Sequence, residues 1–394
     1  MSRLPPTILP ADALLQMRSI LGSPTAQCTS IEQHSGIVSL FRLERDVILA
    51  LGSAWGMAAS IVLPSFYEKA VTVILVPSAD LLPNWTRRLR SMNVPYECFL
   101  SGGHARLAGS ARVILVTMAV ARERHWKAEL QRLVGSGIVI ARIVLDEAHV
   151  ALLRSSWPAF CDLHELRAVA CPLVLITSTY PPVAERWFRE SFGLVHPHIL
   201  RHPQDQSNVS HVLGEVMTDF QQASRLIMAM VSAVVKKNHD RYLIVVASTH
   251  TGMQLSRRLG LEFYHAHTEE GEFASMRPGQ ASMYERWIQS HRSGIITTNA
   301  LVLCKYYPHI RAVFWVGTPP TAMEYMDACD CAVETETWQD LQGTPSTTPG
   351  RKCVRGALEE YRLGKRGRKC FEVEGVALCH FCAAAPVGTT VHPG

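Results

Sequence analysis

The sequence lacks any long apolar run. None of its 394 residues lies in a stretch that approaches the roughly 18 consecutive apolar residues of a transmembrane helix. The first residues do not form a secretory signal either, because Pro5, Pro6 and Asp12 interrupt the apolar positions. These absences argue against a membrane or secreted protein, and we expect a soluble intracellular one.

A strong excess of charge of one sign is absent as well. The formal net charge is +5, which is compatible with nucleic acid as a partner but is common among other proteins. Hydrophobic residues make up 47% of the chain, enough for sizeable cores, and the length suits two or three domains. Of the 11 cysteines, seven are scattered and four lie near the C-terminus. A reducing compartment with one metal site explains this distribution better than a disulfide framework does.

Apolar strand-like runs alternate with amphipathic stretches along most of the chain. This alternation predicts parallel sheets with helices on both faces. It breaks at polar linkers near residues 203–208 and 343–350. We therefore expect an α/β protein with two tandem domains, whose ligands lie at the carboxyl ends of the strands. The predicted strands are Val47–Ala50, Val71–Val76, Val113–Val116, Ile138–Leu145, Leu173–Ile176, Leu243–Val246, Ile295–Thr298 and Val313–Val316, and the predicted helices are Leu81–Met92, Ala119–Leu133 and Gly252–Leu259.

The most informative residues are Asp146-Glu147-Ala148-His149, which follow the strand-like run Ile143–Leu145. An acidic pair at the carboxyl end of a strand is where nucleotide-hydrolysing proteins hold Mg²⁺ and polarise water. Further along the chain lies Thr177-Ser178-Thr179, followed by a tyrosine and two prolines. The two motifs together are much more specific than either one.

In this order the motifs resemble the superfamily 2 helicases, most closely the RecQ-like branch with a DEAH motif, over residues 28–382. The resemblance implies two RecA-like P-loop domains, ATP and Mg²⁺ as cofactors, single-stranded or partly duplex DNA as a partner, and a nuclear location. It implies that Asp146 holds Mg²⁺, that Glu147 orients the attacking water and that His149 couples to the neighbouring domain. The Thr177–Thr179 segment would link hydrolysis to movement on DNA.

Other segments resemble family motifs but also have ordinary explanations. Gln33 stands where the family reads the adenine edge, yet Ser30 and Gln33 also match a helix capping box. Thr117 and the segment Leu81–Trp85 stand where the family touches the DNA backbone, and either is also compatible with a plain strand or helix end. In the second domain, the positions that resemble family motifs are Phe263–His267, Trp287, Thr297–Ala300 and Tyr307–Arg311.

The phosphate-binding loop departs from the family. Its usual Thr-Gly-x-Gly-Lys-Ser is here Ser53-Ala54-Trp55-Gly56-Met57-Ala58. Backbone N–H groups between Ser53 and Gly56 can still attract an anion. However, Met57 replaces the lysine that offsets phosphate charge, and Ala58 replaces the hydroxyl that binds Mg²⁺. Because the loss of one oriented donor commonly costs about 10²–10³ in rate, we expect impaired hydrolysis.

The second domain shows parallel departures. Tyr306 stands where the family has an aspartate that couples to the nucleotide, and Cys331 and Glu334 stand at the two arginine-finger positions. An arginine finger contributes about 10³–10⁵ to phosphoryl transfer. Three parts of the ATP-hydrolysing machinery therefore differ from the family pattern.

The C-terminal segment contains Cys353, Cys370, Cys379 and Cys382, in the spacing C-x₁₆-C-x₈-C-x₂-C. Four thiolates can close a tetrahedral Zn²⁺ site that stabilises a small unit, and RecQ-like proteins carry a similar module with a helix like Val354–Leu363. Unconnected buried cysteines, or His380 in place of one cysteine, remain alternatives.

Five cations lie in the segment Arg362–Lys369 between the first two cysteines, among them Arg366 and Arg368. They suit phosphate contacts, but a solvated basic loop or a nuclear import signal is an equal explanation.

These observations predict two RecA-like domains, residues 1–205 and 209–340, and a four-cysteine zinc module, residues 351–386. The leading hypothesis is a RecQ-like helicase fold that binds nucleic acid and is impaired in ATP hydrolysis and unwinding. An active ATP-dependent 3′–5′ DNA helicase is one alternative, and a non-catalytic interaction scaffold is another. Protein partners are not predicted.

Overall fold

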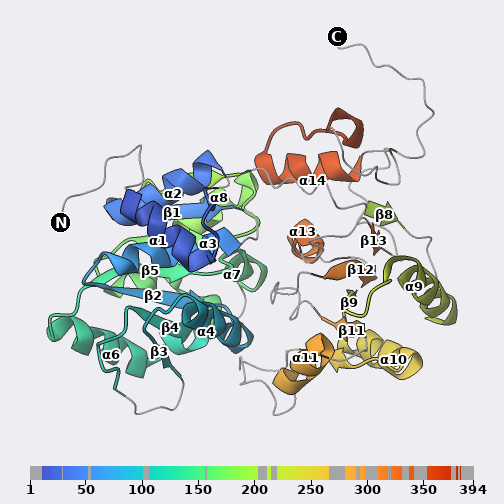
Figure 1. Cartoon of the computed structure of the whole chain (residues 1–394), viewed down its shortest axis with the longest axis horizontal. Helices are drawn as coiled ribbons and strands as arrows, with labels where there is room; N and C mark the ends of the chain where they lie inside the picture. Colours follow the sequence, from blue (N-terminus) through green and yellow to red (C-terminus); the bar gives the residue numbers. More distant parts are fainter. Residues whose placement is uncertain are drawn as a thin grey trace, which may run out of the picture. The chain divides into compact units, whose positions relative to one another are not determined.

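The chain folds into two compact units, each built around its own sheet (Figure 1). In the first unit, the described residues run from 11 to 202, and in the second they begin at 211. The computed structural model describes residues 11–28, 30–51, 55–100, 106–155, 158–202, 211–213, 220–265, 280–289, 293–298, 309–317, 319, 321–330, 337–340, 353–373, 379 and 382.

The first unit contains a seven-stranded sheet with the order β3-β4-β2-β5-β6-β1-β7, and every strand pair is parallel. Every residue of β2, β4 and β5 is buried, so both faces of the central strands are covered. The strands are β1 Val47–Ala50, β2 Val71–Val76, β3 Tyr96–Phe99, β4 Val113–Thr117, β5 Ile140–Leu145, β6 Leu173–Ile176 and β7 His198–Arg201. The helices are α1 Ala11–Leu21, α2 Ile31–Arg42, α3 Trp55–Val62, α4 Leu82–Ser91, α5 Met118–Ala121, α6 Arg124–Gly135, α7 His149–Leu153 and α8 Glu185–Phe192.

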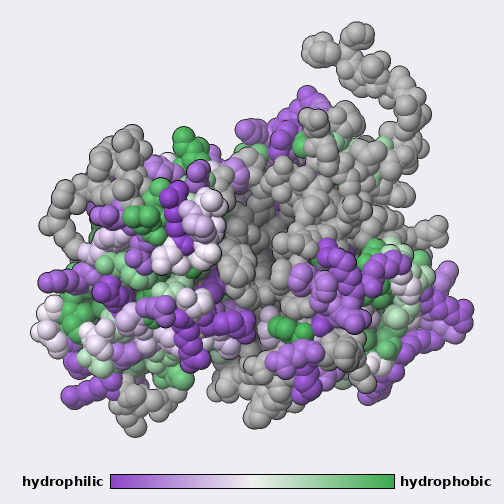
Figure 2. Space-filling view, viewed as in Figure 1, coloured by the Kyte–Doolittle hydropathy of each residue, from purple (hydrophilic) through white to green (hydrophobic). Residues whose placement is uncertain are grey.

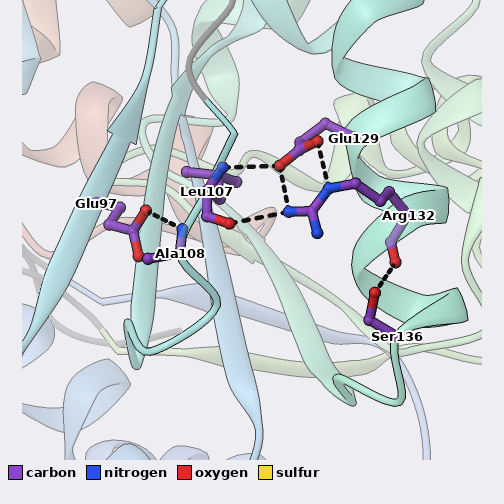
Figure 3. A network of polar contacts seen from close by, with 6 residues as sticks. All are labelled: Glu97, Leu107, Ala108, Glu129, Arg132 and Ser136. Carbon is purple, nitrogen blue, oxygen red and sulfur yellow. Dashed lines mark hydrogen bonds and ion pairs between the residues drawn. The ribbon is translucent and has the colours of Figure 1, made fainter.

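Two carboxylates anchor the connection between β3 and β4 (Figure 3). Glu129 of α6 accepts the Leu107 N–H at 2.8 Å, and Arg132 donates to both of its oxygens at 2.6 and 2.8 Å. Arg132 also donates to the Leu107 carbonyl at 2.9 Å, while Glu97 of β3 accepts the Ala108 N–H at 2.9 Å. The backbone groups of Leu107 and the Ala108 N–H are therefore satisfied by the helix and strand beside them.

The second unit contains a six-stranded sheet with the order β10-β11-β9-β12-β13-β8, again with parallel pairs. Its core includes Ile227, Ile244, Leu255 and Phe314. The strands are β8 His211–Leu213, β9 Arg241–Val246, β10 Phe263–Tyr264, β11 Gly294–Thr297, β12 Ile310–Val316 and β13 Thr337–Asp340. The helices are α9 Phe220–Val234, α10 Thr249–Leu259, α11 Gln280–Gln289, α13 Ala322–Asp330 and α14 Val354–Leu363.

The predicted α/β class with parallel sheets is confirmed, and the predicted strands are present with small shifts. The strand expected to begin at Ile138 begins at Ile140, because the Ile138 N–H still bonds back to Leu133 of α6. The helix expected over Ala119–Leu133 is two helices, because the backbone at Glu123 is extended between α5 and α6.

The limits predicted for the domains remain a prediction, because residues 203–210 and 341–352 lie outside the described part of the chain. Among the helices that are described, none has the length and apolar character needed to cross a membrane. Figure 2 shows hydrophilic residues spread over the described surface of both units on the face in view. This distribution is typical of α/β units that bury their apolar residues in sheet cores.

Candidate functional site

The acidic pair lies directly after β5, at the carboxyl edge of the first sheet. The Asp146 N–H bonds to the Leu75 carbonyl of β2 at 2.9 Å, and the Ala148 N–H bonds to the Ile176 carbonyl of β6 at 2.7 Å. Glu147 between them has a φ of 44°, in the left-handed region that residues other than glycine seldom adopt. Such backbone positions cluster at functional sites, where the surrounding structure holds them in place.

Both carboxylate oxygens of Asp146 accept hydrogen bonds from the protein. The indole N–H of Trp85, a buried side chain of α4, donates to Oδ2 at 2.7 Å. The Glu147 N–H donates to Oδ1 at 3.1 Å. A carboxylate has about four lone-pair positions, so the protein already uses two of them. Sequence reasoning missed the role of Trp85, because 61 residues separate the two partners and no spacing rule connects them.

His149 joins the acidic segment to Thr177–Thr179. Its side chain is fully buried, with Nδ1 3.1 Å from Thr177 Oγ1 and 3.5 Å from Glu147 Oε2. The Thr177 hydroxyl donates its one hydrogen to the Thr179 carbonyl at 2.6 Å and accepts the Thr179 N–H at 3.1 Å. Because that hydrogen is already used, His149 must donate from Nδ1 to Thr177. The structure therefore brings together all the predicted catalytic and coupling residues except Ser178, which lies between the threonines and is partly exposed.

Gln33 lies in α2 and is nearly buried. Its backbone N–H bonds to Ser30 Oγ at 3.1 Å, so the helix-capping explanation is correct for Ser30. The Gln33 side-chain amide instead reaches Ser60 Oγ of α3 at 3.4 Å. The adenine contact predicted for Gln33 remains a prediction.

The residues at the predicted phosphate site do not fit Mg²⁺–triphosphate well. Helix α3 begins at Trp55 and includes Gly56, with Met57 partly buried and Ala58 buried. Mg²⁺ takes oxygen ligands, yet Ala58 presents a methyl group, and Asp146 keeps only two of its about four lone-pair positions free of hydrogen bonds. Ser53 lies outside the described residues, as do Tyr306, Cys331 and Glu334 of the second unit.

Thr117, predicted to touch the nucleic-acid backbone, is buried at the end of β4. Its Oγ1 accepts the Val120 N–H at 3.3 Å and so caps α5. The explanation as a helix end therefore accounts for this hydroxyl, and the nucleic-acid contact remains a prediction.

The four predicted zinc ligands lie together, with their sulfur atoms all within 4.8 Å of one another. The Cys353–Cys370 sulfur distance is 3.5 Å and the Cys379–Cys353 distance is 3.9 Å. A tetrahedral site with Zn–S bonds of about 2.3 Å has sulfur atoms about 3.8 Å apart, whereas a disulfide needs about 2.05 Å. Cys353, Cys370 and Cys379 are buried. These thiols therefore fit a structural zinc ion, while His380, the alternative ligand, lies outside the described residues.

The helix predicted beside this cluster is α14, which begins directly after Cys353, and the Cys353 sulfur accepts the Gly356 N–H at 3.5 Å. Both arginines predicted to contact phosphate pair with carboxylates of the same segment. Arg366 donates to Glu372 and Arg368 donates to Glu359, each at 2.8 Å. Their side chains remain 77% and 50% exposed, so these ion pairs are of the kind that contribute only about 0–1 kcal/mol.

No protein-family model matches the sequence. Several solved structures of helicases match its fold. Saccharomyces cerevisiae Dbp5 bound to RNA and ADP BeF3 has a TM-score of 0.62 and 15% identity, covering 89% of this chain and 91% of that one. The DEAD-box helicase Mss116, bound to ssRNA and UDP-BeF, has a TM-score of 0.64 and 11% identity, covering 87% and 77%.

The chain has the fold of the RecA-like helicases. A third match is the Mycobacterium smegmatis helicase Lhr bound to ssDNA and AMP-PNP, with a TM-score of 0.62 and 15% identity. It covers 84% of this chain, which spans 47% of the Lhr chain. The likeness shows a shared fold, and both the helicase superfamily and its RecQ-like branch remain predictions from the motifs.

Proposed function

We propose that this protein binds single-stranded nucleic acid through a helicase fold in which ATP hydrolysis is impaired. The observation that carries the proposal is the contrast within one sheet edge. His149 lies 3.1 Å from Thr177 Oγ1 and 3.5 Å from Glu147 Oε2, whereas Met57 and Ala58 supply neither the cation nor the hydroxyl that phosphate and Mg²⁺ require.

Binding of nucleic acid is supported by the ligands present in the matching helicase structures. Dbp5 and Mss116 are bound to RNA, and Lhr is bound to ssDNA. The RecQ-like motifs favour DNA for this chain. Arg366 and Arg368 are candidate phosphate contacts, because a DNA phosphate can compete with their exposed ion pairs.

Impaired ATP hydrolysis is supported by the two replacements in the phosphate-binding loop, Met57 for lysine and Ala58 for a hydroxyl residue. Replacing one oriented donor commonly lowers a rate by about 10²–10³, and this chain lacks both the lysine and the hydroxyl. Trp85 adds a further obstacle, since a ligand that needs Asp146 Oδ2 must share it with the indole N–H. Any residual nucleotide binding then depends on backbone N–H groups and Gln33.

The test measures two properties of the full chain. Anisotropy with labelled single-stranded DNA and RNA of equal length should show binding that weakens as salt rises, with DNA bound more tightly. ATP turnover in the presence of DNA should stay at the level of Glu147→Gln, the matched control that keeps size but removes the charge. Robust DNA-stimulated turnover that Glu147→Gln abolishes would refute the impaired state.

The intact Glu147–His149–Thr177 network favours a second candidate, an active helicase with an unusual phosphate loop. The substitution Met57→Lys separates the two. If the wild-type protein already unwinds DNA and Met57→Lys adds little, the active helicase is correct. If neither nucleic acid nor nucleotide binds, the chain is an interaction scaffold.

The zinc module, the domain limits and the nuclear location complete the proposal. We propose that Cys353, Cys370, Cys379 and Cys382 hold one structural Zn²⁺ within residues 351–386, following domains at 1–205 and 209–340. Metal analysis of the purified chain and limited proteolysis test these assignments, and a fluorescent fusion tests the location.

A further inference from the structure

A polar hollow of about 320 Å³ lies at the amino-terminal edge of the first sheet. His198 is the first residue of β7 and pairs in register with Val47, the first residue of β1. Because the strands are parallel, the hollow lies at the opposite edge from the acidic pair. Its volume is at the lower end of small-molecule pockets, roughly 300–1,000 Å³. Its lining consists of Ser35, Val38, Ser39, Arg42, Glu44, Arg45 and His198.

Two arginines of this lining differ from the ion-paired arginines elsewhere in the unit. Arg142 and Arg167 each bind a carboxylate, Glu68 and Asp46 respectively. Within the described part of the chain, neither Arg42 nor Arg45 has an ion pair or a side-chain hydrogen bond. Glu44 is the one carboxylate among the lining residues, so the lining carries a net positive charge.

His198 adds a third nitrogen donor. Its Nδ1 lies 2.8 Å from Ser39 Oγ, and the Ser39 hydroxyl donates to the Ser35 carbonyl at 2.9 Å. Since that hydroxyl has one hydrogen, His198 donates from Nδ1 and leaves Nε2 as the second ring nitrogen. Nε2 becomes a donor when the ring is protonated. Burial, and next the nearby Arg45, lower the pKa of His198.

We propose that this hollow binds a dianionic phosphoryl group between Arg42, Arg45 and His198. Guanidinium groups match phosphate oxygens with two parallel hydrogen bonds, and the seryl hydroxyls Ser35 and Ser39 lie beside them. The inference is independent of the nucleotide-hydrolysis assignment. The ligand is either free phosphate or the terminal phosphate of an oligonucleotide, which share this chemistry.

Stabilisation of a helix end explains only part of the arrangement. Arg42 lies in the last turn of α2, where a cation favours the helix dipole. That effect requires neither a hollow nor His198 and Arg45, which come from outside the helix.

Protonation of His198 should be coupled to occupancy of the site. The charged groups near its ring are Arg42, Glu44 and Arg45, while the buried Asp46 carboxylate is engaged by Arg167. A bound anion offsets the arginine charge that lowers the pKa, so the pKa of His198 should rise on binding. NMR titration of the His198 ring in the full chain, with and without inorganic phosphate, measures this change.

The binding experiment compares matched variants by calorimetry with inorganic phosphate. Arg45→Gln should weaken binding about tenfold, the effect of losing one charged hydrogen-bond donor, whereas Arg45→Lys should weaken it less. Arg186→Gln is the control, because Arg186 is an exposed arginine of α8 in the same unit. Unchanged melting temperatures establish that the variants fold.

The outcomes distinguish the source and can overturn the proposal. Competition by a 5′-phosphorylated oligonucleotide but not by its 5′-hydroxyl form assigns a nucleic-acid end. Phosphate binding without such competition assigns a free phosphate. No phosphate binding with an unmoved His198 signal, or equal weakening by Arg186→Gln, shows that the hollow is only a solvated basic surface.

Discussion

Single side chains decide the chemistry at the carboxyl edge of the first sheet. Asp146 and Glu147 are the residues that a nucleotide-hydrolysing protein would have there, but Trp85 donates to Asp146 at 2.7 Å. Indole is a neutral donor that cannot be lost by deprotonation in water. The bond therefore competes with any cation for Oδ2.

Replacing Trp85 tests this competition directly. Trp85→Phe removes the N–H but keeps an aromatic ring in the core, so Asp146 should bind a divalent cation about tenfold more tightly, as expected for the loss of one hydrogen bond to a charged group. Mn²⁺ affinity measured by paramagnetic resonance checks the change. Trp126→Phe, at a buried tryptophan of α6, is the control. Equal Mn²⁺ affinity in wild type and Trp85→Phe would show that the indole does not compete.

The stability of the second unit should depend on pH through the Asp240 carboxylate. Burial alone would raise the pKa of Asp240, but hydrogen bonds from Arg311 and from the Lys237 and Lys236 N–H groups outweigh burial and lower it to about 2. Because the folded pKa is depressed, its contribution of about 2 kcal/mol is present above pH ~4 and is lost as pH falls toward 2. Asp240→Asn should therefore destabilise the second unit by about that amount at neutral pH.

The free energy of unfolding, measured with urea at several pH values, checks the sign of this pH dependence. The difference between wild type and Asp240→Asn should shrink as the pH is lowered from 4 toward 2. Asp162→Asn is the control, because the Asp162 side chain is 59% exposed and its ion pair with Arg122 should contribute little. A difference that stays constant with pH would contradict the assigned cause.

Among the secondary-structure elements, strand position determined what the sequence could predict. Central strands such as β2 and β5 are mostly apolar, because both faces are buried, and their polar residues Thr72 and Arg142 are buried and bonded to each other. The edge strands β3 and β7 are only partly buried and carry polar residues, so no apolar run marks them. These edge strands form because a neighbouring strand offers them a ladder of backbone hydrogen bonds. That partner is present only in the folded unit, so the segment's own sequence does not reveal the strand.

Helix α14 and the loop after it depend on two glycines. A Cβ on Gly367 would collide with the Gly356 backbone of α14. Gly367→Ala should therefore push the basic loop from the helix and disturb Cys370, lowering bound zinc to well below one ion per chain. Gly135→Ala is the control, since a Cβ there meets open space. Zinc content by atomic absorption checks the result, and full zinc in Gly367→Ala would show that the loop can shift without cost to the site.

At the level of the whole chain, two separate cores predict two unfolding events. Each unit has its own sheet and buried apolar residues, so each can unfold as a cooperative unit. Removing zinc should lower the stability of the second unit, which contains the cysteine cluster, because metal binding is coupled to folding. The melting of the first unit should not change.

Calorimetry with tryptophan fluorescence separates the two events. Trp85 and Trp126 report on the first unit, and Trp287 and Trp315 on the second. After treatment with a strong chelator, the transition seen by the second pair should move to lower temperature, and added Zn²⁺ should restore it. A shift of both transitions by the same amount would contradict independent units.

Local patterns were sufficient for the fold class, for the central strands and for the candidate chemistry at Asp146, Glu147 and the four cysteines, because each is written in neighbouring residues or in short spacings. Contacts that close over long separations required the tertiary structure. They include the Trp85–Asp146 bond and the bond from the Leu107 N–H to Glu129. A periodic pattern reports which face of a segment is buried, but only the folded chain decides which donor meets which acceptor.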